Sequence, residues 1–268
     1  LTHPTWAVSA HLPEHDLPLS GRPALDLAAC EMALNLAETR EVLKPWLDAV
    51  SQTLADSIVV EIDRRVITPY AEGLEVWWQS SSNRRYSNWL GVCAGSILGA
   101  CESLAAQGQP RPKARARALA GLRLFLEQGF TPGGECDEGV GYWSYGVGSA
   151  CYGWSRLPRA EFEAQVDQER FRRIAGYPRR AHLFGDCFFS GNDGGLTAQA
   201  PLDCVPWLAA ASGNEFLGWW AREHGRSFAW LLSQHLRQLT ANDSQKSEVR
   251  SEKAKGESQK SEVKSQKS

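Results

Sequence analysis

The sequence has no long apolar run and no recognisable leader at its start. Nowhere do about eighteen consecutive apolar residues occur, the length that a membrane-spanning helix needs. The first residues, LTHPTWAVSAHLPEHD, lack the charged-then-apolar order of a signal peptide, and the chain begins with Leu instead of an initiating Met. We therefore expect no membrane partner, and we expect the chain to be a mature form or a fragment.

An excess of positive charge is also missing. The 29 Lys and Arg residues are balanced by 31 Asp and Glu residues, which gives a formal net charge of −2, and the basic residues are scattered. Proteins that bind nucleic acid carry a basic patch or stripe, because charge dominates recognition of the phosphate backbone. The composition therefore argues against nucleic acid as a partner.

Metal-binding cysteine pairs are absent as well. The seven cysteines include no CxxC spacing, and most stand beside small or apolar residues (Cys30, Cys93, Cys101, Cys136, Cys151, Cys187 and Cys204). Structural zinc sites are built from close ligand pairs. We predict no metal and no cofactor, and we interpret the cysteines as buried free thiols.

Helical periodicity is present over most of the chain. From about residue 24, apolar residues three or four apart predict an amphipathic helix. Pro45 is expected to open a second helix that lasts until Pro69 and carries Trp46, Val50 and Leu54 on its apolar face. We expect the two helices to form an antiparallel pair.

Further helices follow along the chain. The segment NWLGVCAGSILGACESLAA predicts a third helix, whose small residues let neighbouring backbones come close. A fourth helix runs through ARARALAGLRLFLEQ and ends at Gly129, and more helices are expected at 159–175 and 205–239. Period-two alternation persists nowhere, so the predicted fold class is all-α.

The last residues, from Ala241, have a different composition. SQKSEV occurs at 244–249 and again at 258–263, and this segment has no aromatic residue and no leucine. Such a segment cannot bury enough apolar surface to offset the entropy lost on ordering. We predict a helical domain over residues 1–240 and a disordered low-complexity tail over 241–268.

Helix pairs joined by short loops fit two all-α architectures, an open solenoid and a closed ring of hairpins, the α/α toroid. In a ring, the loops gather at one end around a central cleft. The stretch GGECDEGVGYWSYG at 133–146 is too rich in glycine for a helix, so we expect it to be such a loop. Its aromatic faces and acidic side chains favour a carbohydrate ligand, although a packed turn without a ligand fits the same composition.

Four segments together resemble the helical domain of heparinase II/III-type polysaccharide lyases. They are PEHD, DLAACEMALNLA, NRRYSNWLGVCAG and, about fifty residues later, GGECDEGVGYWSYG. The spaced pair SNW and EGVGYW is the specific part of a resemblance that covers roughly residues 1–236. It implies an incomplete α/α toroid of antiparallel helix hairpins, a β-sandwich in full-length members that this chain lacks, and a periplasmic or secreted bacterial location.

Such lyases cleave uronic-acid polysaccharides by β-elimination. The C5 proton of a uronate is weakly acidic because the neighbouring carboxylate is negative, so that charge must be screened before a base removes the proton. The resemblance implies that the Asn88 amide screens the carboxylate and that Tyr142 acts as the acid. Contacts to an acidic polysaccharide are expected from six neighbouring side chains (Arg84, Arg85, Trp89, Glu138, Trp143 and Tyr145).

The sequence departs from several characterised lyases at one important position. Those lyases carry a histidine directly after the asparagine, where this sequence has Trp89. Other family histidines and tyrosines come from the β-sandwich. We therefore expect this chain alone to be inactive or weakly active.

The proposed site residues also have structural interpretations. Asn88 could cap the helix that begins at Trp89, and Tyr142 could be a buried aromatic residue. Glu138 could tie down its own loop, and Trp143 and Tyr145 could belong to the core.

Other residues leave two more functional classes open. His182 in RRAHLFGDC and His15 in PEHD are candidates for either a catalytic or a structural role. Glu138 and Asp186 could be the carboxylate pair of a glycoside hydrolase, although Asp186 could also cap or turn the chain. The third class is a non-catalytic glycan-binding domain.

Overall fold

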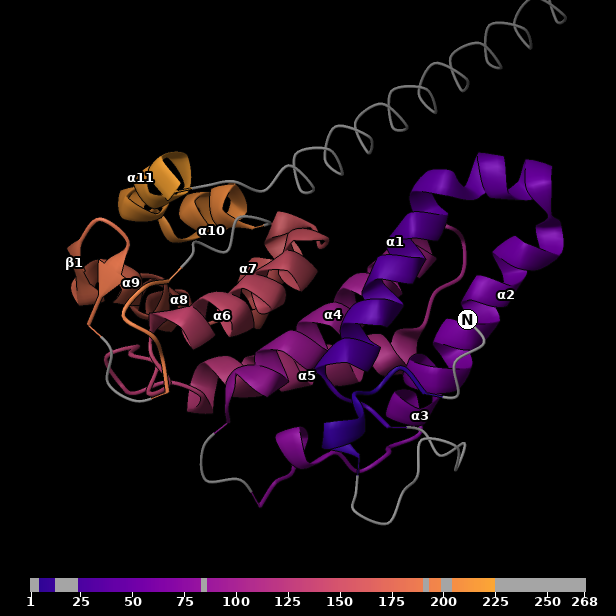
Figure 1. The fold of residues 1–268 in the computed structure, drawn as a ribbon, viewed down its shortest axis with the longest axis horizontal. Helices are drawn as coiled ribbons and strands as arrows, with labels where there is room; N and C mark the ends of the chain where they lie inside the picture. Colours follow the sequence, from indigo (N-terminus) through magenta and orange to yellow (C-terminus); the bar gives the residue numbers. More distant parts are fainter. Residues whose placement is uncertain (1–4, 13–23, 83–85, 190–192, 199–203, 225–268) are drawn as a thin grey trace, which may run out of the picture. The chain divides into compact units, whose positions relative to one another are not determined.

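The computed structural model describes residues 5–12, 24–82, 86–189, 193–198 and 204–224. Within these ranges nearly all regular structure is helical, which confirms the predicted all-α class (Figure 1). All of the described elements belong to one unit, Leu1–Arg226. The predicted tail over 241–268 lies outside the described residues.

The chain begins with a short turn and a long helical hairpin. Turn η1 spans Ser9–His11, α1 spans Leu27–Val50 and α2 spans Gln52–Ile62, after which the π-helical segment η2 (Asp63–Ile67) and α3 (Thr68–Ala71) continue the helix. The Ser51 hydroxyl accepts a hydrogen bond from the Leu54 backbone at 3.3 Å and so caps α2. Helix α2 turns back beside α1, as the sequence predicts (Figure 1).

The predicted helix boundary at Pro45 is wrong. Helix α1 continues through Pro45 to Val50, and the chain reverses only at Ser51, whose backbone is extended. Because the turn falls there, Trp46, Val50 and Leu54 do not form a common core face. The exposed fraction is 64% for Trp46 and 79% for Val50. Capping at Ser51 therefore outweighs the loss of one backbone hydrogen bond at Pro45.

Three central helices follow the turn η3 (Trp77–Gln79). They are α4 (Asn88–Ala106), α5 (Pro112–Gln128) and α6 (Val140–Ser155). The first two confirm the predicted third and fourth helices, and α5 ends at Gly129 as expected. Shorter helices complete the described chain: α7 (Arg159–Gln165), α8 (Gln168–Ala175), α9 (Tyr177–Ala181), α10 (Val205–Ser212) and α11 (Glu215–His224).

A small hairpin interrupts these short helices. Strands β1 (His182–Phe184) and β2 (Cys187–Phe188) pair antiparallel, with the turn at Gly185 in the left-handed region at φ +50°. The sequence analysis expected no strand, because two such short strands carry too few residues for an alternating pattern.

The stretch at 133–146 is only partly a loop. Its second half forms the start of α6, after Gly139, whose φ of +89° favours glycine. The expectation that its glycines exclude a helix was therefore wrong. Gly146 lies inside α6 because a Cβ there would come within 3.0 Å of the Asn88 Cα atom. Close packing thus outweighs the low helix propensity of glycine.

Helices α1, α4 and α6 run parallel and pack together. Along α4 the contacts to α6 advance in the same order on both helices, from Asn88 against Gly146 to Gly95 against Gly153. Helix α5 lies beside α4 in the opposite direction. Both an open solenoid and part of an α/α toroid are built from helices that alternate in direction in this way. Closure into a toroid stays a prediction.

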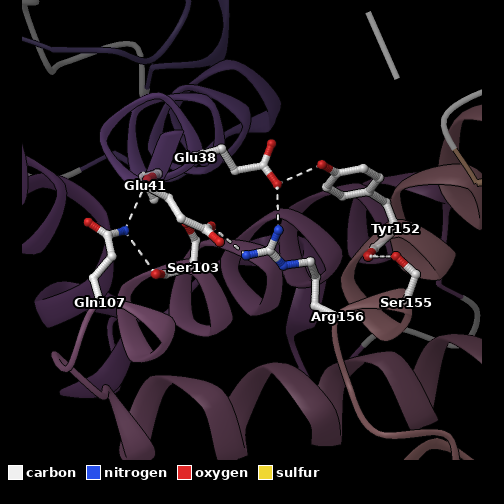
Figure 2. A network of polar contacts seen from close by, with 8 residues as sticks. Glu38, Glu41, Ser103, Gln107, Tyr152, Ser155 and Arg156 are labelled. Atoms are coloured by element: carbon white, nitrogen blue, oxygen red, sulfur yellow. Dashed lines mark hydrogen bonds and ion pairs between the residues drawn. The ribbon is translucent and has the colours of Figure 1, made fainter. Parts of the chain in front are cut away.

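A polar network joins the second halves of α1, α4 and α6 (Figure 2). Arg156 on α6 forms ion pairs with Glu38 at 3.4 Å and Glu41 at 2.6 Å on α1. Glu38 also accepts a hydrogen bond from the Tyr152 hydroxyl at 2.6 Å, and Glu41 accepts one from Ser103 on α4 at 2.6 Å. Because three helices contribute, the network specifies their alignment.

Most residues of helix α4 are buried. Asn88–Ala106 is long and apolar enough to cross a membrane, and 78% of its most apolar window is buried inside the protein. The core helix of a globular domain has these same properties, so this helix is weak support for a membrane span. Small and polar residues interrupt its aliphatic run, so the sequence holds no unbroken stretch of eighteen apolar residues there.

Candidate functional site

The N-terminal ends of α1, α4 and α6 lie at one end of the described unit, since these three helices are parallel. The segments that enter them are η1 before α1, η3 before α4 and the loop 129–139 before α6. Most of the described candidate residues come from these segments or from the first two turns of the helices. This end is therefore the candidate site.

Asn88 begins α4 and is buried, with 4% of its surface exposed. Its backbone N–H donates to the Glu138 carboxylate at 3.2 Å, which links the loop before α6 to the start of α4. Within the described residues its side-chain amide has no hydrogen-bond partner. The N-cap is Ser87, whose hydroxyl accepts from the Trp89 backbone at 3.4 Å, so the capping interpretation of Asn88 was wrong.

Glu138 accordingly holds its loop in place through the Asn88 backbone, in line with its structural interpretation. Tyr142, in the first turn of α6, is 38% exposed, so the alternative of a buried aromatic residue was wrong. Trp143 is fully buried, and its indole N–H donates to the Ile174 carbonyl at 3.0 Å. Trp143 is thus a core residue, and its ring has no surface to offer a ligand.

Tyr145 lies one turn after Tyr142 and bridges to α1. Its hydroxyl donates to Glu31 at 2.8 Å. Burial raises the pKa of the Glu31 carboxyl, the hydrogen bond from Tyr145 lowers it in part, and the nearby Asp26 carboxylate raises it again. Burial and the hydrogen bond to Glu31 raise the pKa of the Tyr145 phenol well above its ordinary value, which makes Tyr145 unsuited to act as a base.

A histidine and an aspartate that the sequence analysis did not select lie at the same end. Nδ1 of His11 is 2.8 Å from an oxygen of Asp26, the N-cap residue of α1. The His11 ring contacts Trp89 edge to face, with ring centroids 4.8 Å apart. Trp77 packs on Trp89 at the same centroid distance of 4.8 Å and is 58% exposed. His11 and Asp26 are fifteen positions apart in the sequence, so no local pattern marked them as partners.

Several other candidates lie elsewhere. Arg84, Arg85 and His15 lie outside the described residues. His182 belongs to β1, where its ring bonds the Gly185 carbonyl at 2.9 Å and packs on Phe188, which supports its structural interpretation.

Asp186 is exposed in the turn between β1 and β2. No contact joins it to Glu138 within the ranges that the structure describes. Among the same residues, no three His, Cys, Asp or Glu side chains are grouped as a metal site requires.

In comparisons with known proteins, no family model matches the chain and no curated protein matches it. The resemblance to heparinase II/III-type lyases therefore rests on the sequence motifs given above.

Proposed function

We propose that this chain is the helical part of a polysaccharide lyase that cleaves uronic-acid polysaccharides by β-elimination. The observation that carries the proposal is the placement of Asn88 and Tyr142. The Asn88 backbone lies against Gly146, and Tyr142 precedes Gly146 by four residues, which is about 6 Å along a helix. A buried amide and an exposed phenol thus occupy neighbouring helix ends.

The two side chains match two of the requirements of elimination. An amide N–H donor screens the uronate carboxylate and makes the C5 proton easier to remove, and it does so best where little water competes, as at buried Asn88. The exposed Tyr142 phenol carries a hydroxyl proton that it is able to donate to the departing glycosidic oxygen.

The surrounding aromatic residues support a sugar ligand. Trp77 is exposed and packs on Trp89, which directly follows Asn88 in α4. Sugar rings present C–H faces that pack on indole rings. These two tryptophans therefore offer a binding surface beside the proposed chemical groups, and they replace Trp143 in that role.

The hydrolase alternative has less support in the described residues. A hydrolase needs two carboxylates that flank the scissile bond, about 5 Å or about 6.5–9.5 Å apart. The Glu138 carboxylate is bonded to the Asn88 backbone, and Asp186 lies in an exposed turn of the hairpin. The two carboxylates therefore have different surroundings, one bonded to the start of α4 and the other in an exposed turn.

The test is an elimination assay on a panel of glucuronate-, mannuronate- and guluronate-containing polysaccharides. Elimination leaves a C4–C5 double bond conjugated with the carboxylate, which absorbs ultraviolet light. Weak activity of this chain alone should give a slow rise in absorbance with at least one polymer, and we expect Tyr142→Phe to slow that rise by about 10²–10⁴-fold, the usual range for loss of a general acid. Trp143→Phe is unsuitable as a control because it would disturb the core.

Tyr152→Phe is the matched control, since it removes a tyrosine hydroxyl from the same helix but ten residues beyond Tyr142, outside the proposed site. It should keep most of the activity. Reducing ends without absorbance would identify a hydrolase instead. Retention of a polymer without cleavage would identify a binding domain, and either result would contradict the proposal.

A further inference from the structure

We propose that His11 is the general base of this site and that Asp26 holds it in position. The inference rests on the proposed function and adds the proton acceptor that Asn88 and Tyr142 do not supply. It is carried by the contacts of His11 with Asp26 and Trp89, which come from two different helices.

Asp26 is placed to orient an imidazole. Only 3% of its surface is exposed, and its carboxylate accepts hydrogen bonds from the backbone N–H groups of Val8 and Ala29, both at 2.8 Å. Because the Asp26 carboxylate accepts from both backbone N–H groups, we infer that it also accepts from His11. Nδ1 of His11 is then the protonated nitrogen that donates across the 2.8 Å contact. This tautomer leaves Nε2 of His11 with the lone pair that a general base requires.

The ring of His11 remains accessible while its orientation is constrained. About a third of its side chain, 32%, is exposed, whereas that of Asp26 is 4% exposed. The edge-to-face contact with Trp89 restricts rotation of the imidazole from the other side. A partly exposed imidazole held by a buried carboxylate is the arrangement found where histidine accepts protons from substrates.

His11 lies at the same end of α4 as Asn88, which elimination requires of the base and the amide. The C5 proton is separated from the uronate carboxylate by a single carbon–carbon bond, so the base and the amide that screens the carboxylate must be neighbours. His11 contacts Trp89, the residue directly after Asn88. Trp89 occupies the position where other lyases have a histidine. In this chain His11 packs against Trp89 and so brings a histidine to the same place.

The two glutamates at this end, Glu138 and Glu31, are less suited than His11 to act as the general base. Glu138 is bonded to the Asn88 backbone and Glu31 accepts from Tyr145. An imidazole is also a stronger base than a carboxylate, with a reference pKa of about 6.5 against about 4.3.

The reaction balances without a cofactor. Nε2 of His11 takes the C5 proton, and the electrons of the C5–H bond form the C4–C5 double bond. The C4–O bond breaks, and its electron pair leaves with the glycosidic oxygen, which receives the proton of the Tyr142 hydroxyl. The products are an unsaturated uronate and a new hydroxyl group, and solvent returns the proton from His11 to Tyr142.

The experiment compares His11→Ala with wild type on the polymer that wild type cleaves. We expect kcat/KM to fall by about 10²–10⁴-fold, and added imidazole to restore part of the rate. Rescue by imidazole separates a base from a structural residue, because a free base cannot repair a misfolded site. Asp26→Asn should lower kcat more than it changes KM, since asparagine still caps α1 but no longer fixes the tautomer.

His182→Gln is the matched control, because it removes a histidine that lies in the β1–β2 hairpin and should leave the rate unchanged. Near-wild-type activity of His11→Ala would overturn the inference while leaving the proposed function intact. A large loss without imidazole rescue would overturn it as well. Absence of unsaturated product from wild type on every polymer would overturn the proposed function, and the role of His11 with it.

Discussion

Two tyrosine–glutamate hydrogen bonds connect α6 to α1, and their surroundings differ. Tyr145 donates to Glu31, and seven residues further along both helices Tyr152 donates to Glu38. Glu38 has Arg156 beside it, whereas Glu31 has the like charge of Asp26. The repeat at two helical turns indicates a structural function for the tyrosine hydroxyls. Among the described residues no cation pairs with Glu31, and this has a consequence for stability.

We predict that Glu31 makes the protein less stable as pH rises. Its pKa is raised above the ordinary value of 4.5 in the folded protein, chiefly by burial, so the folded state binds this proton more tightly than the unfolded state. The resulting stabilisation is complete below about pH 4.5 and is lost as pH rises through the folded pKa. Glu31→Gln keeps an acceptor for Tyr145 and should remove this loss, as measured by urea unfolding across the pH range.

Glu61 should have the opposite effect on the pH dependence of stability in the same urea-unfolding measurement. The hydrogen bond from Arg64, with further support from Arg65, lowers the pKa of Glu61 to about 2. Its contribution should be present above about pH 4.5 and lost as pH falls toward 2. Unfolding curves of Glu31→Gln that keep the wild-type pH dependence would contradict the role assigned to Glu31.

At the scale of whole elements, the close approach of α4 and α6 depends on glycine. A Cβ on Gly91 would lie 2.6 Å from the Gly146 carbonyl oxygen and 2.6 Å from the Phe125 ring. We predict that Gly91→Ala lowers the free energy of unfolding by about 1–3 kcal/mol or more, because the backbones must separate. Chemical unfolding monitored by circular dichroism measures the change.

Gly141 supplies the control for that substitution. It lies in the first turn of α6 with no atom within 4 Å of an added Cβ. Gly141→Ala should be neutral or stabilising by up to about 1 kcal/mol, as expected when alanine replaces glycine in a helix. A gain in stability for Gly91→Ala as large as that for Gly141→Ala would mean that helix propensity, and not close packing, sets the effect at Gly91.

The network in Figure 2 leads to a prediction for the alignment of three helices. Arg156 is 9% exposed at its side chain and lies between Glu38 and Glu41. Arg156→Met would leave two neighbouring carboxylates without their cation, and we expect it to cost about 3–5 kcal/mol of unfolding free energy. Lys44→Met, which breaks the more exposed ion pair with Asp48, should cost about 0–1 kcal/mol.

The comparison of these two variants decides what the network contributes. Thermal unfolding of both, with wild type in parallel, gives the difference directly. A loss for Arg156→Met no larger than that for Lys44→Met would mean that the network does not stabilise the alignment.

At the scale of the whole molecule, burial controls the chemistry of the cysteines. Six of the seven are buried and Cys187 is half-buried, and all of them are free thiols. Burial raises the pKa of the Cys101 thiol to about 12 and also raises the pKa of the Cys93 and Cys151 thiols well above its ordinary value. Since the thiolate is the reactive form, buried cysteines should react slowly.

We predict that Cys187 is alkylated first in the native protein. Brief treatment with iodoacetamide followed by peptide mass spectrometry should find most of the label there, and Cys187→Ser should remove the fast reaction. Unfolding in urea should make all seven reactive at similar rates. Labelling of Cys93 as fast as Cys187 under native conditions would contradict the buried core described above.

The sequence by itself determined the all-α class, most of the helices and the region of the candidate site. Helix formation and capping depend on residues within about four positions of one another, so periodicity predicted α4 and α5, and the motifs singled out Asn88 and Tyr142. Local patterns misplaced the end of α1, however, because the cap at Ser51 competes with Pro45.

Only the tertiary structure decided which side chains meet. Trp143 and Tyr142 are adjacent in the sequence, yet Trp143 is buried with its indole N–H bonded to the Ile174 carbonyl of α8, whereas Tyr142 is exposed. His11 and Asp26 are fifteen positions apart, and both come beside the first turn of α4. Their meeting depends on the direction and offset of α1, α4 and α6, which contacts between distant residues such as Gly91 and Gly146 determine.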